Sequence, residues 1–259
     1  MIKLKRIYEW LGGFALLLFS FYFTDKISEI VIDRTTLMQE IKTVSKNSNE
    51  EPIDAVINKN DNSIIPGKYG KKINYHKSYA SMKEFGIFNE NYLVYDKIKP
   101  NKTVEDNKDK YIISGNPHNR NISIIIEEDQ IISNYLDQNN INYDSIATHL
   151  TKLKEGKEYI NGEYDKKYFI KLNSHINNNL ICLKNYSNLE ECLKKDYYII
   201  DTHNHLNNDN INEVLNRLSN GSIILIQANT DLKYINLLLN ELKYKDLTPV
   251  YISNLIKEE

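Results

Sequence analysis

Cysteine, glycine and net charge are all scarce in this sequence, and each scarcity argues against a class of function. The 259 residues carry a formal net charge of -2, from 33 basic and 35 acidic side chains. A protein that holds nucleic acid through its phosphates needs a cationic surface, so this balance argues against nucleic acid as a partner. Only nine glycines are present. Gly67 and Gly70 flank a turn, but no glycine pattern leading from a strand into a helix follows them, which excludes a phosphate-binding loop there.

Cys182 and Cys192 are the only cysteines. Neither has a histidine beside it in a recognisable motif, which argues against a thiolate nucleophile. The pair closes a loop of about ten residues, and a disulfide there would contribute on the order of 2 to 3 kcal/mol in an oxidising compartment. We expect this disulfide, and two free buried thiols are the alternative.

Charge is also nearly absent from residues 7–24, where Glu9 is the only charged residue. The length of this apolar run is close to the roughly 17 to 25 residues that a membrane-spanning helix requires. Three basic residues precede it, namely Lys3, Lys5 and Arg6. No small-residue cleavage site follows the apolar core. We therefore predict a signal anchor, with a buried soluble helix or cleavage near Ser20 as the alternatives.

The basic cluster places residues 1–6 on the cytoplasmic side by the positive-inside rule. Everything after Asp25 should then lie outside the membrane, as a single-pass protein with an extracytoplasmic C-terminal domain. Residues 25–51 form a juxtamembrane helix and linker, because apolar residues recur there at three- and four-residue steps. This stalk could support a homodimer. The apolar positions are Ile27, Ile30, Val31, Leu37, Met38, Ile41 and Val44.

Residues 52–110 form a small N-terminal region that carries no catalytic constellation. From residue 111 onward the pattern alternates strands with helices, as parallel α/β folds do. Strands are predicted at 112–126, 222–226 and 248–252, and helices at 130–138, 210–218 and 232–242. Gly221 stands where the middle helix would have its C-cap.

The segments 111–129 (YIISGNPHNRNISIIIEED) and 221–231 (GSIILIQANTD) resemble the first and last core strands of the polysaccharide deacetylases, the NodB-homology domain of carbohydrate esterase family 4. The resemblance covers roughly 111–255 and is strongest at its two ends. It implies that residues 111–259 form a divergent, incomplete (β/α) barrel of the deacetylase type.

The resemblance also indicates which positions would carry the family's chemistry. Glu127 and Glu128 stand where the first motif supplies a general-base Asp and a metal-ligating Asp. The stretch 156–163 corresponds to the H-[ST]-x-x-H metal motif and contains no histidine. Gln227 stands at the histidine that serves as general acid, and a glutamine cannot transfer a proton. The sequence thus implies no catalytic residue and no cofactor, although a divalent metal such as zinc is the alternative.

An HxH pattern, His203 and His205, follows the apolar run 197–200 and is discounted as a zinc site. Amidohydrolases place such a pair after their first strand, and no His or Cys remains downstream here to complete a ligand set. His149 and His175 are too far from it in the sequence to be assigned to the same site.

Two functional hypotheses follow. The first is a membrane-anchored extracytoplasmic pseudoenzyme of the deacetylase type that binds cell-wall glycan or another envelope protein. The second is an active divergent hydrolase that deacetylates N-acetylated cell-wall polysaccharide with Glu127 and Glu128. A purely structural envelope protein, recruited through its stalk helix, is a third possibility.

Overall fold

The structure, a computed structural model, describes residues 2–148, 153, 156–176 and 180–258, without the side chains of residues 2–11 and 25. The chain divides into two compact units. The first comprises residues 1–51 and 70–98, and the second comprises 52–69 and 99–259. Residues 52–69 and 99–110 therefore group with the barrel, whereas the sequence-based division placed them in a separate region.

The first unit begins with two helices, α1 (Ile2–Asp33) and α2 (Thr36–Ser48). They are separate because Thr35 is extended and caps α2, its hydroxyl accepting a hydrogen bond from the backbone N–H of Met38. The prediction of one helix continuing through the stalk is thus wrong at this residue. The unit is completed by β3 (Gly70–Ile73), α3 (Tyr75–Met82), the 3₁₀ turn η1 (Glu90–Tyr92) and β4 (Tyr95–Ile98), with β3 and β4 antiparallel. A small core of α2, β3 and α3 side chains holds it together.

Among the residues that the structure describes, no helix is both long enough and apolar enough to cross a membrane. Part of the predicted span, residues 7–11, has no described side chains. The membrane anchor stays a prediction.

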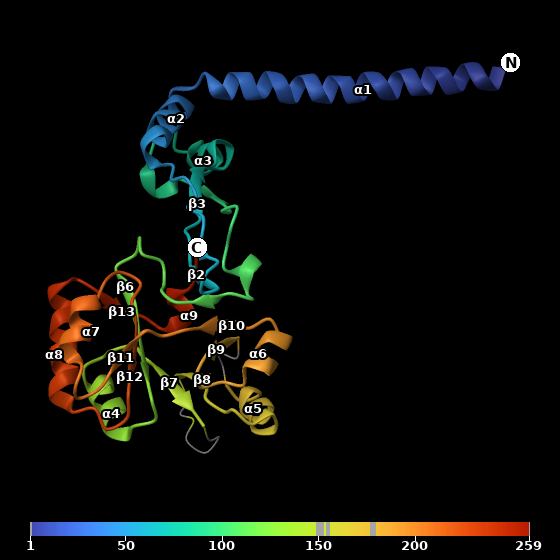
Figure 1. The fold of residues 1–259 in the computed structure, drawn as a ribbon. Helices are drawn as coiled ribbons and strands as arrows, with labels where there is room; N and C mark the ends of the chain where they lie inside the picture. The colour runs from blue at the N-terminus through green and yellow to red at the C-terminus, as the bar shows by residue number, and fades with distance from the viewer. Residues whose placement is uncertain (1, 149–152, 154–155, 177–179, 259) are drawn as a thin grey trace. The chain divides into compact units, whose positions relative to one another are not determined.

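The second unit is built on one curled sheet (Figure 1). Its strand order is β1-β2-β5-β10-β9-β8-β7-β6-β12-β11, and β13 also pairs with β6. All neighbours are parallel except β1 and β2. The bounds are β1 Val56–Asn58, β2 Ser63–Ile65, β5 Tyr111–Ile112, β6 Asn121–Ile126, β7 Asp144–Ala147, β8 Glu158–Asn161, β9 Ile181–Leu183, β10 Tyr198–Ile200, β11 Asn204–Leu206, β12 Ile223–Ile226 and β13 Thr248–Pro249.

The connection from β10 to β11 forces this sheet to curl. Ile200 ends β10 and Asn204 begins β11, so the connecting chain spans at most about 14 Å. The two strands lie six positions apart in the strand order. At about 4.8 Å per step, a flat sheet would separate them by roughly 29 Å. The sheet must therefore bend round until these strands approach each other, which produces a half-barrel.

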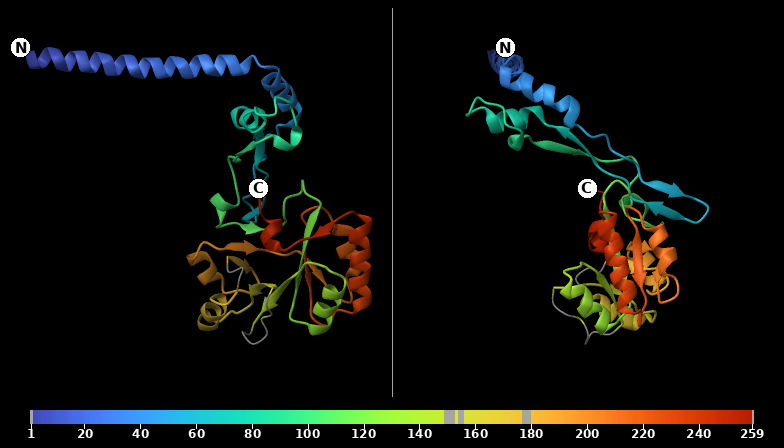
Figure 2. Two further views of the ribbon diagram at one scale, coloured as in Figure 1. Left: turned by 180° about the vertical axis from the view of Figure 1, so that it is seen from behind. Right: turned by 90° about the vertical axis from the view of Figure 1, so that its left-hand side faces the viewer.

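Alternation along the strands gives the half-barrel an inner and an outer face. Ile125 and Leu225 belong to the inner cluster, whereas Ile124 and Ile224 pack outside. Helices α4 (Gln130–Gln138), α7 (Ile211–Arg217) and α8 (Leu232–Tyr244) cover one side of the outer face, and α5 (Lys166–Asn173) and α6 (Leu189–Lys194) cover the other, as Figures 1 and 2 show from two sides. The short helix α9 (Ile252–Leu255) contributes to the inner cluster.

Two predicted strands differ from the observed ones. The range 112–126 contains β5 and β6, separated by a turn-rich segment, and they occupy different places in the sheet. The break occurs where two backbones meet, since the N–H of Gly115 donates to the carbonyl of Gly221 at 2.7 Å. Gly221 has a φ of +81°, and a Cβ there would lie 2.5 Å from that glycine's oxygen. Glycine is therefore needed at residue 221 because the two backbones come so close there. Gly221 is not the C-cap of α7 as predicted, since that helix already ends at Arg217.

The range 248–252 is also only partly a strand. β13 contains two residues, and Ile252 already begins α9. The prediction missed this turn into the barrel because the apolar run continues without interruption through it.

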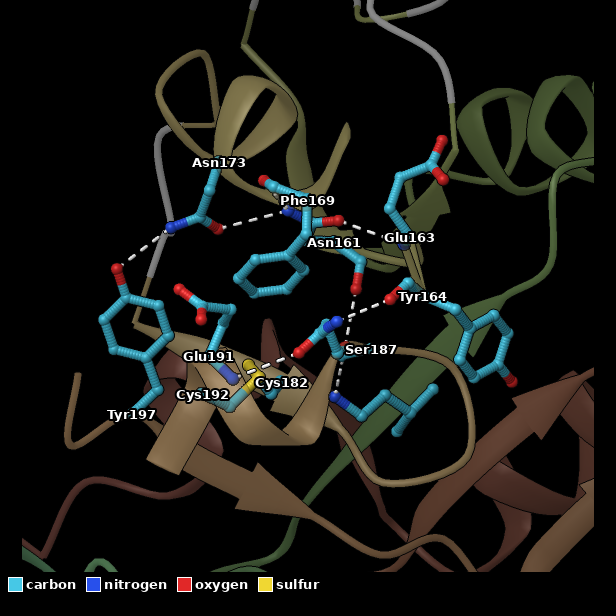
Figure 3. Close-up of a disulfide and its surroundings, with 12 residues drawn as sticks. Asn161, Glu163, Tyr164, Phe169, Asn173, Cys182, Ser187, Glu191, Cys192 and Tyr197 are labelled. Carbon is cyan, nitrogen blue, oxygen red and sulfur yellow. Dashed lines mark hydrogen bonds between the residues drawn. A yellow bond between two sulfur atoms is a disulfide. The ribbon is translucent and has the colours of Figure 1, made fainter. Parts of the chain in front are cut away.

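The structure joins Cys182 on β9 to Cys192 on α6 by a disulfide, the pairing expected from the sequence. Both cysteines are fully buried and pack with Phe169 and Tyr197 (Figure 3). Next to them, the buried Asn161 donates to the carbonyl of Phe169 at 2.8 Å. The bridge thus fastens α6 to the outer face of the sheet.

Asp144, the first residue of β7, is fully buried. Its Oδ2 accepts hydrogen bonds from the backbone N–H of Ile252 at 2.8 Å and from the hydroxyl of Ser123 at 3.5 Å. Its Oδ1 has no hydrogen-bond partner among the described residues. Burial raises the pKa of this carboxyl well above its usual range.

This raised pKa predicts that stability falls as the pH rises. An acid that is harder to ionise when folded stabilises the protein below its unfolded pKa of about 3.9, and that contribution is lost between this value and the folded pKa. Asp144→Asn mimics the neutral acid. We expect its free energy of unfolding, from urea titrations at pH 4 to 8, to exceed the wild-type value by on the order of 1 kcal/mol near neutral pH and to match it near pH 4. A wild-type advantage that grows with pH would contradict this.

Candidate functional site

The carboxyl ends of β6, β9 and β12 meet around one half-buried carboxylate, Glu127. Its Oε1 accepts a hydrogen bond from the hydroxyl of Tyr186 at 2.6 Å, and its Oε2 accepts one from the backbone N–H of Ala228 at 2.8 Å. Tyr186 follows β9, and Ala228 lies two residues beyond β12. We call Glu127, Tyr186 and Ala228 the mouth of the half-barrel. Both oxygens of its carboxylate have protein donors.

The Tyr186 phenol is held as a donor at the mouth. Burial raises its pKa, and the hydrogen bond to the negatively charged Glu127 raises it further. The phenol of Tyr164 is a further, smaller cause. Tyr164 follows β8, so it lies at the same edge of the parallel sheet as the mouth. The Tyr186 phenol thus keeps its proton and donates a hydrogen bond to Glu127.

Glu128 does not join Glu127. Successive residues of a strand point to opposite faces, so Glu128 leaves on the outer side, where it is exposed and accepts from the hydroxyl of Thr148 at 3.4 Å. It lines a cavity of about 530 Å³ that also contains Tyr159 and Leu153. The two carboxylates therefore face different surroundings and cannot act as a pair on one substrate atom.

Asp129 is a residue at this strand end whose role the sequence analysis missed. Its Oδ1 accepts from the N–H groups of Ile131 and Ile132, which caps α4, and its Oδ2 accepts from the N–H of Asn229 at 3.0 Å. Burial opposes ionisation, but these three donors outweigh it and lower the pKa of Asp129. An Asp directly before an apolar helical pattern is the signal that could have revealed it.

Gln227 lies beside the mouth, after β12, where its backbone N–H donates to the carbonyl of Leu206 at 2.9 Å. Its side-chain oxygen accepts from the amide of Asn207 at 3.2 Å. This arrangement offers amide donors and acceptors but no acidic proton.

The stretch that corresponds to the histidine motif forms β8 and its continuation. Directly after β8, Gly162 lies against β7, where a Cβ would be 2.4 Å from Cγ2 of Ile146 and 3.2 Å from the carbonyl oxygen of Ala147. A side chain of any kind at this strand end would have to displace Ile146. The position that follows the strand is therefore closed to a ligand by packing.

Together these contacts do not fit a divalent metal of the kind that the deacetylase resemblance implies. Within the described residues, no group of three His, Cys, Asp or Glu side chains is arranged to hold a metal ion. The carboxylate best placed at the mouth already has a donor on each oxygen, and the strand end beside it carries glycine. Metal-assisted attack of water finds no support in this geometry.

One histidine of the HxH pair has structural contacts. His205, on β11, bonds through Nε2 to the hydroxyl and carbonyl of Thr202, at 2.9 and 3.0 Å. His203 is exposed, and the exposed His175 is bonded to its own helix end. His149 lies outside the described residues. Among the described residues, no histidine belongs to a group of three or more His, Cys, Asp or Glu side chains that could hold a metal ion.

Two exposed tyrosines stand near the end of β8. Tyr164 is 63% exposed and Tyr168, on α5, is 58% exposed. The backbone of Tyr164 is fixed, because its carbonyl accepts from the side-chain amide of Asn188, the N-cap of α6. In Figure 3 its ring points away from the disulfide cluster. It thus offers an aromatic surface that can cover an apolar ligand face, with a hydroxyl at its tip.

From the contacts at the mouth we expect substitutions of the two neighbouring glutamates to change the free energy of unfolding by different amounts. Glu127→Gln replaces one acceptor oxygen by an NH₂ group that faces another donor, so we expect a loss of about 1 to 3 kcal/mol in the free energy of unfolding. The matched variant Glu128→Gln changes an exposed side chain, and we expect less than about 0.5 kcal/mol. Chemical denaturation of both variants measures the difference, and equal effects would contradict the assigned contacts.

Comparison with known proteins agrees with this fold. No protein-family model matches the chain. It is 32% identical over 97 residues to the uncharacterized protein YlxY of Bacillus subtilis (strain 168), a match that spans 38% of this chain and 30% of that protein.

Solved structures extend the likeness. The chain is similar to wild-type BA3943 of Bacillus anthracis, a CE4 family pseudoenzyme, with a TM-score of 0.58 and 16% identity over 86% of this chain and 95% of that one. The chain has the fold of the CE4 deacetylases. Two mutants of BA3943, one of them described as having restored enzymatic activity, match with TM-scores of 0.60 and 0.57 at 16% and 15% identity, over 86% of this chain and 98% of each of theirs. At these identities the likeness concerns the fold.

Proposed function

We propose that this protein is a membrane-anchored, extracytoplasmic pseudoenzyme of the deacetylase type that binds N-acetylated cell-wall glycan at its barrel mouth. The observation that carries the proposal is the double engagement of Glu127, whose oxygens accept from Tyr186 and Ala228. A carboxylate held in this way is positioned by protein donors and needs no metal to orient it. The likeness to a CE4 pseudoenzyme supports the same conclusion.

The chemistry around the mouth suits a sugar. N-acetylated glycans present hydroxyl groups, amides and flat apolar ring faces. The exposed ring of Tyr164 can cover such a face, while Gln227 and Asn207 offer amide donors and acceptors.

Attachment to the membrane is the second part of the proposal. It is supported by the basic residues before residue 7 and by the apolar side chains that α1 exposes. An anchored module of this kind would hold glycan close to the membrane surface.

Glycan binding should depend on Tyr164. We expect Tyr164→Ala to weaken binding of N-acetylglucosamine oligomers by about fivefold in Kd, or roughly 1 kcal/mol, because an aromatic contact is lost. Tyr244→Ala is the matched control, since Tyr244 is 84% exposed on α8 and should leave Kd unchanged. Calorimetric titration of the intact chain in detergent gives both values. No binding by the wild type would reject the glycan, and equal losses in both variants would reject the site.

A further inference from the structure

The turn after α3 presents two large apolar side chains to solvent. The N–H groups of Phe85 and Gly86 both donate to the carbonyl of Met82, at 3.0 and 3.1 Å, so the chain turns sharply as the helix ends. Gly86 has a φ of +66°, and apart from its chain neighbours no described atom lies within 4 Å of where its Cβ would be. Phe85 is 65% exposed and Ile87 is 73% exposed. We call residues 83–88 the wedge loop.

The wedge loop is held firmly at its base. Met82 is fully buried, and Phe88 packs against the same core of the first unit. At the tip, the ring of Phe85 stacks on that of Tyr92 with centroids 5.9 Å apart, and Tyr92 remains 46% exposed. A fixed loop that exposes Phe and Ile beside an amphipathic Tyr differs from scattered surface hydrophobic residues, which are common and need no partner.

The same unit contains a second apolar surface. The large side chains of α1 from Phe14 to Phe23 are 49% to 70% exposed, and no core in the described structure covers them. The surface continues towards the end of α1 as a stripe at helical spacing, Ile27, Ile30 and Val31, each at least 53% exposed. A lipid bilayer is one occupant that covers both surfaces. The bilayer would bury the α1 stripe and the tip of the wedge loop, with Phe85 and Tyr92 at the interfacial depth that Tyr rings prefer.

We infer that the wedge loop is a second membrane contact, which inserts Phe85 and Ile87 into the interfacial layer of the bilayer to which α1 attaches. This inference rests on the membrane attachment proposed above. Two contacts, one through α1 and one through the loop, would prevent the first unit from rotating freely about its anchor.

Tryptophan fluorescence can place the loop directly, because the chain has a single Trp, Trp10. In the full chain carrying Trp10→Phe, Phe85→Trp introduces one reporter. The chain is reconstituted into phosphatidylcholine and phosphatidylglycerol vesicles with either ordinary or brominated acyl chains. We expect the emission to shift to shorter wavelength and to fall to about half in the brominated vesicles. Adding Ile87→Ser should reduce that quenching.

The matched control is Tyr244→Trp in the same background, at an exposed position of the second unit, which should show neither the shift nor the quenching. Sedimentation of the wild-type chain with the vesicles separates the two proposals. A chain that co-sediments while its Phe85→Trp reporter is unquenched keeps its anchor and overturns the wedge contact. A blue shift that grows with protein concentration, without quenching, would assign the loop to a second copy of the chain instead. Failure to co-sediment would overturn both the anchor and the wedge.

Discussion

The short link between β10 and β11 is the constraint on which the second unit depends. Three residues join strands that lie six positions apart in the strand order. The chain cannot cross a flat sheet of that width, so the sheet bends and an inner face appears. Ile and Leu side chains fill that face, and α9 supplies the last of them. Without the bend, the ends of β6, β9 and β12 could not meet around one carboxylate.

Under the proposed function, the contacts at the mouth would take the place of a metal in a deacetylase-type fold. In a site of that type, a cation would hold the carboxylate in place. Here a tyrosine hydroxyl and a backbone N–H do so, and both are supplied by neighbouring strand ends. The glycine after β8 closes against Ile146, which removes the space that a ligand side chain would need. Hydrogen bonds thus fix the carboxylate at the mouth, and packing closes the strand end after β8.

Patterns along the chain predicted much of this structure because the strongest signals are local. The apolar run of β12, the stripes of α4 and α8 and the close spacing of the two cysteines each follow from residues near one another in the sequence. The division of the stalk at Thr35 was missed, since one capping hydroxyl decides it within an otherwise continuous apolar pattern. The placement of β5 beside β10 was missed because a pairing across some 90 residues leaves no periodic trace.

The candidate site was predicted in part. The sequence identified Glu127 and Gln227 as positions of interest, and both lie at or beside the mouth. It could not distinguish Glu127 from Glu128. Which of the two side chains faces the mouth is known only once the end of the strand and its inner face are known. It did not reveal Tyr186 at all, since the partner of a carboxylate 59 residues away is set by the curl of the sheet.

Metal content and acetate release together decide whether this fold carries a working metal site. The intact purified chain would be equilibrated with zinc, cobalt or manganese, dialysed and assayed for bound metal, then incubated with N-acetylated glycan oligomers. We expect no stoichiometric metal and no acetate. One metal per chain, together with acetate release that Glu128→Gln abolishes while the variant stays folded, would contradict this expectation and establish a divergent hydrolase.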